Sequence, residues 1–149
     1  MADIVSPEKR SQMMASIKGK NTKPEIAIRK ALHRMGFRYK LHDKTLPGTP
    51  DLVFPKYKAV LFIHGCFWHG HNCNLFKLPS TRPDFWMDKI TRNQYVDQKN
   101  ISDLNCRNWR TATIWECSIR KNAKYDVSEV IKIFTQWLVS DKKIFEIRG

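Results

Sequence analysis

The order of elements predicted from this sequence is helix, strands, helix, strand, helix, which indicates one α/β domain with a mixed central sheet flanked by helices. A capping box at residues 22–25 opens a helical apolar pattern that stops at Gly36. The continuous apolar run at 59–63 is typical of a central strand covered on both faces. An amphipathic stretch at 126–139 predicts the last helix.

The remaining elements follow from shorter patterns between these three. They are a half-buried strand at 37–41, a short strand at 51–54, a long helix at about 83–106 and a strand at 109–116. In the long helix we expect an apolar face, made of Phe85, Ile90, Tyr95, Ile101 and Leu104. The C-terminal segment 142–149 is assigned to no element.

Composition favours one basic domain with a polyanionic partner. The chain has 149 residues, enough for one core, and we expect a basic N-terminal arm at 1–20 in front of a domain at 21–149. A formal charge of +13 favours a polyanionic partner, and a ribosomal or membrane-surface protein is the alternative. Neither a signal peptide nor a membrane-spanning stretch is visible, so we expect a soluble intracellular protein.

A Pro-Asp pair before a short strand resembles the first half of a nuclease motif. Asp51 follows a proline at the start of a short strand, as in nucleases in which carboxylates on adjacent strands bind Mg²⁺ and a lysine acts nearby. The acid and the lysine of the second strand are missing, because that strand ends in Ile63 and His64. A main-chain carbonyl and a histidine could replace them. Glu25 could reach the site through water, although the capping box also explains it.

A loop rich in histidine and cysteine predicts zinc. Cys66, His69, His71 and Cys73 fall within eight residues, and Cys117 ends a predicted strand. The spacing leaves open whether His69 or Cys117 completes a set of four ligands. The alternative is that these cysteines are simply buried small hydrophobic residues.

Together these motifs resemble the very short patch repair (Vsr-type) endonucleases. The resemblance is carried by Asp51, the loop His-Gly-Cys-Phe-Trp-His-Gly-His-x-Cys at 64–73 and Trp-Glu-Cys at 115–117, with Thr-Arg-x-x-Phe-Trp at 81–86 and Arg-Ser-x-x-Met at 10–14. It implies a restriction-endonuclease-like core of the PD-(D/E)xK type. The implied reaction is a Mg²⁺-dependent nick of one DNA strand, 5′ to the thymine of a T·G mismatch that arises when 5-methylcytosine deaminates.

The resemblance also assigns roles to residues at the reaction centre. It places Mg²⁺ on Asp51 and the carbonyl of Ile63, a position where the family often has threonine. His69 activates or orients the attacking water, supported by Glu25 and His64. Structural Zn²⁺ is assigned to four residues: Cys66, His71, Cys73 and Cys117.

Further residues are implied in mismatch recognition. Phe67, Trp68 and Trp86 would enter the duplex from the major groove, and Met14 from the minor groove. Lys89 and Asn93 lie one turn beyond Trp86 on the same helix and would contact base edges. Without the resemblance, core packing would explain Trp86 and a solvated helix face would explain Lys89 and Asn93.

The implied partner is double-stranded DNA with a T·G mismatch, and mismatch-repair proteins are further candidate partners. We expect a monomer that acts in the bacterial cytoplasm and does not bind a membrane. Two other functions are compatible with parts of the pattern. A restriction-like nuclease of the same fold would need no wedge aromatics. A zinc-stabilised DNA-binding module would not need Asp51 or His69.

Overall fold

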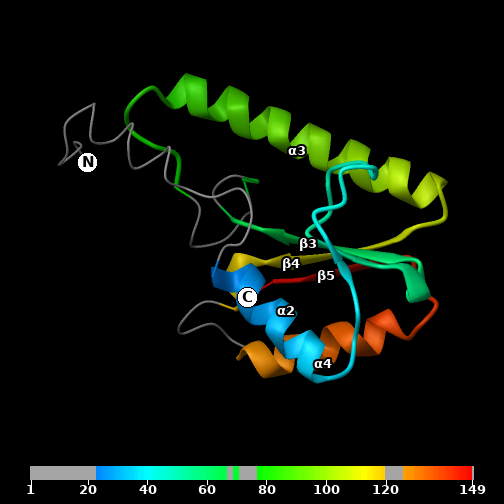
Figure 1. Ribbon diagram of the computed structural model, residues 1–149. Helices are drawn as coiled ribbons and strands as arrows, with labels where there is room; N and C mark the ends of the chain where they lie inside the picture. The colour runs from blue at the N-terminus through cyan, green and yellow to red at the C-terminus, as the bar shows by residue number, and fades with distance from the viewer. Residues whose placement is uncertain (1–22, 67–68, 71–76, 120–125, 149) are drawn as a thin grey trace.

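The computed structural model describes residues 23–66, 69–70, 77–119 and 126–148, and its centre is a five-stranded sheet (Figure 1). The strands, in both chain order and sheet order, are β1 (Lys40–Leu41), β2 (Leu52–Phe54), β3 (Ala59–His64), β4 (Arg110–Trp115) and β5 (Ile144–Ile147). β1, β2 and β3 pair antiparallel, whereas β3, β4 and β5 pair parallel. The predicted mixed α/β sheet is therefore confirmed.

Helices cover both faces of this sheet. α2 (Lys23–Arg34) and α4 (Val127–Leu138) lie together on one face, and α3 (Pro83–Cys106) crosses the other (Figure 1). Two short 3₁₀ helices, η1 (Pro55–Tyr57) and η2 (Glu116–Ser118), follow β2 and β4. In the described part of the chain, no helix is both long enough and apolar enough to cross a membrane.

The continuous apolar run of β3 is explained by burial on both sides. Ala59 and Leu61 pack with α2 and α4, while Val60 and Phe62 pack with Leu104 of α3. Successive strand residues point to opposite faces, so a strand covered on both faces needs apolar residues at every position. β3 is thus held rigidly, and the residues at its C-terminal end are placed with it.

The first helix ends where the sequence predicts. The N–H groups of Gly36 and Phe37 donate to the carbonyls of His33 and Leu32, at 3.0 and 3.1 Å, and Gly36 has φ +95°. This is a Schellman motif with glycine in the left-handed conformation. Only Lys40–Leu41 of the predicted strand at 37–41 pairs with β2, while Phe37 and Tyr39 pack against the core.

The prediction of a single apolar face on the long helix was wrong. Leu104 and Ile90 are buried, but Tyr95 is 68% exposed and Phe85 is 44% exposed. Figure 1 shows that α3 approaches the sheet near its C-terminal end and diverges toward its N-terminal end. At about 100° per residue, Tyr95 lies on the side of the helix opposite Leu104, so one buried face cannot include both residues.

The unassigned C-terminal segment forms β5 at the edge of the sheet. Arg110 of β4 explains how the chain returns there: its guanidinium donates to the carbonyls of Trp137, Leu138 and Lys142, at 2.7, 2.9 and 2.9 Å. The same group lies 4.4 Å from the Trp137 ring centroid. One side chain thus satisfies carbonyls at the end of α4, offsets its negative dipole and ties the α4–β5 connection to the sheet.

We predict that Arg110→Lys destabilises the protein by about 1–3 kcal/mol, because lysine cannot replace the planar fork of donors. Urea unfolding followed by far-UV circular dichroism measures the change. Arg107→Lys is the matched control at the exposed end of α3. Equal stability of the two variants would contradict the role given to Arg110.

Candidate active site

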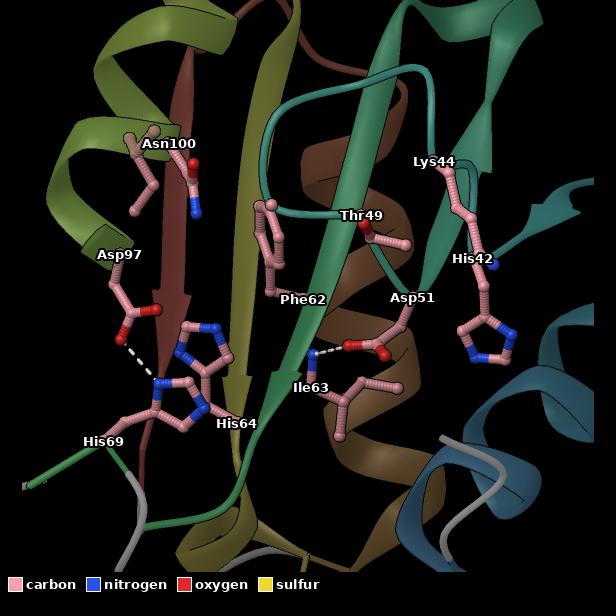
Figure 2. A pocket seen from close by; sticks show the side chains of 12 residues that line it. His42, Lys44, Thr49, Asp51, Phe62, Ile63, His64, His69, Asp97 and Asn100 are labelled. Atoms are coloured by element: carbon pink, nitrogen blue, oxygen red, sulfur yellow. Dashed lines mark hydrogen bonds and ion pairs between the residues drawn. The ribbon is translucent and has the colours of Figure 1, made fainter. Parts of the chain in front are cut away.

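A cavity of about 560 Å³ opens at the C-terminal end of β3. Its wall comes from the loop before β2, the end of β3, residue 69 and one turn of α3 (Figure 2). The polar and titratable side chains that line it are His42, Lys44, Thr49, Asp51, His64, His69, Asp97 and Asn100. Segments distant in sequence therefore bring Asp51, Ile63, His64 and His69 to one place, as the sequence predicted.

Asp51 is held in a partly dehydrated position next to β3. Its Oδ2 accepts a hydrogen bond of 2.7 Å from the N–H of Ile63. Burial, with a smaller contribution from the nearby Glu25 carboxylate, raises the pKa of Asp51 from 3.8 to about 7, and the Ile63 N–H opposes this rise. A carboxylate kept in such a place without full hydration is a strong attractor for a cation.

Glu25 lies next to Asp51, behind the cavity wall. It is 2% exposed, and its Oε2 lies 2.9 Å from both Arg29 Nη1 and His42 Nε2. Glu25, His42 and Asp51 offer ligand atoms that all lie within 4.8 Å of one another. Glu25 itself is not one of the residues lining the cavity. The alternative capping role involves residue 22, which lies outside the described residues.

His42 is a site residue that the sequence analysis missed. It stands in the loop before Asp51 with φ +49°, and its N–H donates to the Asp51 carbonyl at 3.2 Å. A lone histidine in a loop carries no recognisable signal in a single sequence. Only the closure of the loop onto Asp51 places it at the site.

His64 and His69 form a stacked pair on the other side of Asp51. Their ring centroids are 3.8 Å apart and their planes differ by 6°. His64 ends β3 and is 8% exposed, and the edge of Trp115 from β4 packs against it at 5.1 Å between centroids. His64 therefore provides a fixed surface against which the His69 ring is oriented.

Asp97 of α3 is the second residue that the sequence analysis missed. Its Oδ2 lies 2.5 Å from His69 Nδ1, and Figure 2 shows the opposite ring nitrogen of His69 pointing into the cavity. Asp97 follows Asn93 by four residues, so the helix stripe of Lys89 and Asn93 continues into it. That spacing was the signal that could have revealed it.

The predicted recognition residues of α3 lie away from the cavity. Trp86 is half-buried with its ring 5.3 Å from that of Phe85, Asn93 is half-buried and Lys89 is exposed. At 1.5 Å per residue, Trp86 is about 16 Å along the helix from Asp97. Among the described residues, Trp86 belongs to neither core cluster. Met14, Phe67 and Trp68 lie outside the described residues.

Two of the four predicted zinc ligands are described. Cys66 is buried and Cys117 is half-buried. In the parallel pair β3–β4, His64 is opposite Trp115, and each cysteine comes two residues later on its own segment. Both thiols thus follow the same end of adjacent strands, as a shared ligand set requires. His71 and Cys73 lie outside the described residues.

The chemistry of the two sides of the cavity differs. Glu25, His42 and Asp51 combine two carboxylates with one imidazole, whereas His64, His69 and Asp97 form a second cluster within 4.8 Å that combines two imidazoles with one carboxylate. Oxygen-rich sites suit Mg²⁺, while a carboxylate-bound histidine suits proton transfer. An acid that can bind a cation and a histidine oriented by a carboxylate are groups with which metal-assisted hydrolysis can be carried out.

Comparison with known proteins identifies the family. The model of the family described as DNA mismatch endonuclease Vsr matches residues 2–75. The Type II nicking enzyme V.XorIIP of Xanthomonas oryzae pv. oryzae is 49% identical over 119 residues, covering 80% of this chain and 88% of that protein. DNA mismatch endonuclease Vsr of Escherichia coli K12 is 37% identical over 141 residues, covering 95% of this chain and 90% of that protein. The chain belongs to the Vsr family and is an endonuclease.

We predict that Asp51→Asn stabilises the folded protein in buffer without Mg²⁺, by about 2–4 kcal/mol at pH 8, because each pKa unit corresponds to about 1.4 kcal/mol. Between pH 3.8 and about 7 the folded state binds more protons than the unfolded state, so wild-type stability falls as pH rises through this window. Asparagine keeps the Ile63 hydrogen bond without a charge. Its advantage should therefore be complete above pH 7 and disappear near pH 4.

Urea unfolding of both proteins across this pH range measures the difference. A variant that is less stable than wild type at pH 8 would show that Asp51 is not the dehydrated carboxylate described above.

Proposed function

We propose that the chain is a Mg²⁺-dependent endonuclease that nicks one DNA strand 5′ to the thymine of a T·G mismatch, the lesion left when 5-methylcytosine deaminates. The observation that carries this proposal is the cavity in which Asp51 faces the His69–Asp97 pair. The Escherichia coli relative is named a DNA mismatch endonuclease, and other relatives are named nicking enzymes.

The residues around Asp51 fit a hard divalent cation. Asp51 and the main-chain carbonyl of Ile63 would hold Mg²⁺, and Glu25 would act through water. Burial raises the pKa of Asp51, and a bound cation would offset this unfavourable ionisation. Bound Mg²⁺ would stabilise negative charge on the phosphate and lower the pKa of water. Ile63 retains the carbonyl that this role requires, although it lacks the hydroxyl often present at that position.

His69 is suited to remove a proton from water. With Asp97 accepting from Nδ1, a neutral His69 carries its proton there and keeps a lone pair on Nε2. The water oxygen bonds to phosphorus as its proton passes to Nε2. The bond from phosphorus to the leaving ester oxygen breaks, and that oxygen takes a proton from solvent. Stacking on His64 keeps the His69 ring in the required plane.

Mismatch selection is proposed for residues outside the catalytic cavity. Phe67, Trp68 and Trp86, with Met14 on the opposite side, would wedge into the stack beside the mismatch, and Lys89 and Asn93 would contact base edges. Unstacking costs a few kcal/mol and costs least where pairing is already distorted. Phe85 and Met87, which are exposed in the first turns of α3, support a role for that end of the helix in contacting DNA. A monomeric state and contact with mismatch-repair proteins stay predictions.

Zinc is proposed as a structural ion held by Cys66, His71, Cys73 and Cys117. Four protein ligands leave no position for water, so the ion would shape the loop that carries Phe67, Trp68 and His69. The matched positions of the two described cysteines after β3 and β4 support this set. His69 is then not a zinc ligand, so it can bond to Asp97 and take part in catalysis.

The decisive test of function uses a labelled duplex with one T·G mismatch in methyltransferase-site contexts, a matched C·G duplex and Mg²⁺. We predict one nick 5′ to the mismatched thymine and none in the paired control. Asp51→Ala should lower the single-turnover rate by at least about 10³-fold, since it removes the cation anchor, while mismatch binding in a gel-shift assay persists.

Cutting of both duplexes would instead indicate a restriction-like nuclease. Binding without cutting in every context would indicate a zinc-stabilised binding module. Normal turnover by Asp51→Ala would refute the assignment of the cation to Asp51.

We predict that Cys117→Ser loses stoichiometric zinc and unfolds at lower temperature, whereas Cys106→Ser keeps both properties of the wild type. Cys106 is exposed at the end of α3 and is the matched control. Elemental analysis of the purified proteins, with thermal unfolding, measures both effects. Full zinc content in Cys117→Ser would remove this residue from the proposed ligand set.

A further inference from the structure

The cavity that would receive a negatively charged phosphodiester is lined by more carboxylates than lysine or arginine side chains. Asp51 and Asp97 contribute carboxylates, and His42, His64 and His69 contribute imidazoles. Among the described residues that line the cavity, Lys44 alone is a lysine or arginine. A phosphate group that enters here lies close to the Asp97 carboxylate as well as to the cation proposed at Asp51, so a cationic side chain at the rim has a direct electrostatic effect on its binding and reaction.

The loop that carries Lys44 is fixed by local hydrogen bonds. Asp43 Oδ1 accepts from Thr45 N–H at 2.9 Å and from Thr45 Oγ1 at 2.6 Å, and these bonds lower the pKa of Asp43. The acid next to Lys44 is therefore engaged with Thr45. Within the described part of the chain, no ion pair of Lys44 is found.

The same loop is also anchored at its two ends. His42 N–H donates to the Asp51 carbonyl, and a Cβ built on Gly48 would lie 2.8 Å from Asn100 Nδ2 and 3.1 Å from Phe62 Cε1. Gly48 has φ +77°, so both its conformation and its close packing require glycine. Lys44 is thus presented from a fixed loop at an exposed position.

Figure 2 places Lys44 and His42 on one side of Asp51, and His64, His69 and Asp97 on the other. A phosphate bound at Asp51 would therefore lie between the base and the lysine. β3 carries no lysine, so the positive charge expected from the nuclease motif is missing at its usual place in the chain.

We propose that Lys44 contacts a non-bridging oxygen of the scissile phosphate and offsets the charge that develops there during hydrolysis. This inference rests on the function proposed above. It assigns the missing lysine of the strand motif to a loop that precedes Asp51 in the chain. The competing interpretation is that Lys44 is an ordinary solvated side chain, and the two interpretations differ in their effect on the reaction rate.

The experiment compares Lys44→Gln and Lys44→Arg with Lys40→Gln, a charge-matched change on β1 at an exposed position that does not line the cavity. Single-turnover nicking of the T·G duplex is measured with Mg²⁺ and saturating protein. Duplex affinity is measured without Mg²⁺, and thermal unfolding checks that each variant folds.

We expect Lys44→Gln to slow single-turnover nicking by about 10–100-fold, because one charged donor to the reacting phosphate is removed. Lys44→Arg should recover most of the rate, and Lys40→Gln should match the wild type. Duplex affinity should change less than the rate, since one phosphate contact is a small part of the whole interface. Lys44→Gln and Lys40→Gln with equal rates would overturn the proposal.

A phosphorothioate duplex tests the contact itself. Sulfur in place of the contacted non-bridging oxygen should slow the wild-type enzyme in one diastereomer, and this effect should shrink in Lys44→Gln. Equal sulfur effects in both proteins would also overturn the proposal. A wild-type protein that does not nick the mismatched duplex would instead refute the proposed function, so the two failures are distinguishable.

Discussion

The buried carboxylate of Asp51, held against the Ile63 N–H, is the constraint on which the site depends. Its position follows from the antiparallel pairing of β2 with β3, and β3 is itself fixed because both of its faces are buried. Folding thus holds an acid where ionisation is unfavourable, with Glu25 close by. Such an energetic cost is characteristic of a functional site, and the cation proposed at Asp51 would supply the missing compensation.

On the other side of Asp51, the position of the His69–Asp97 pair depends on α3. Near its C-terminal end α3 packs on the sheet through Leu104, and one stripe of the helix brings Asp97 to His69. Its N-terminal end, where Trp86 and Lys89 lie in the sequence, diverges from the sheet (Figure 1). One helix therefore connects the histidine proposed for catalysis with the surface proposed to select mismatches. A change in how α3 packs would alter both together.

Much of the fold could be predicted because its signals are local. The run at 59–63 and the glycine after α2 each reflect short-range chemistry, and both predictions were confirmed. β5 escaped prediction because it depends on Arg110, which contacts carbonyls 27 to 32 residues away. The apolar face of α3 was mispredicted because Tyr95 lies on the side of the helix opposite Leu104, so the two residues cannot share one buried face.

The residues of the candidate site also fall into those that the sequence could predict and those that only the folded chain reveals. Asp51, Ile63, His64 and His69 were predicted from motifs and resemblance, and the structure brings them to one cavity. His42, Lys44 and Asp97 carry no motif, and only the closure of the loop and the crossing of α3 place them there. Phe67, Trp68, His71, Cys73 and Met14 lie outside the described residues, so their roles stay predictions.

The most direct test of the central claim is to locate Mn²⁺, as a substitute for Mg²⁺, by anomalous diffraction from crystals of the wild-type protein. We predict a peak in contact with the Asp51 carboxylate and the Ile63 carbonyl, with His69 bonded to Asp97 and not to the ion. A peak held instead by His64, His69 and Asp97, with none beside Asp51, would contradict it, because the proposed base would then be a metal ligand.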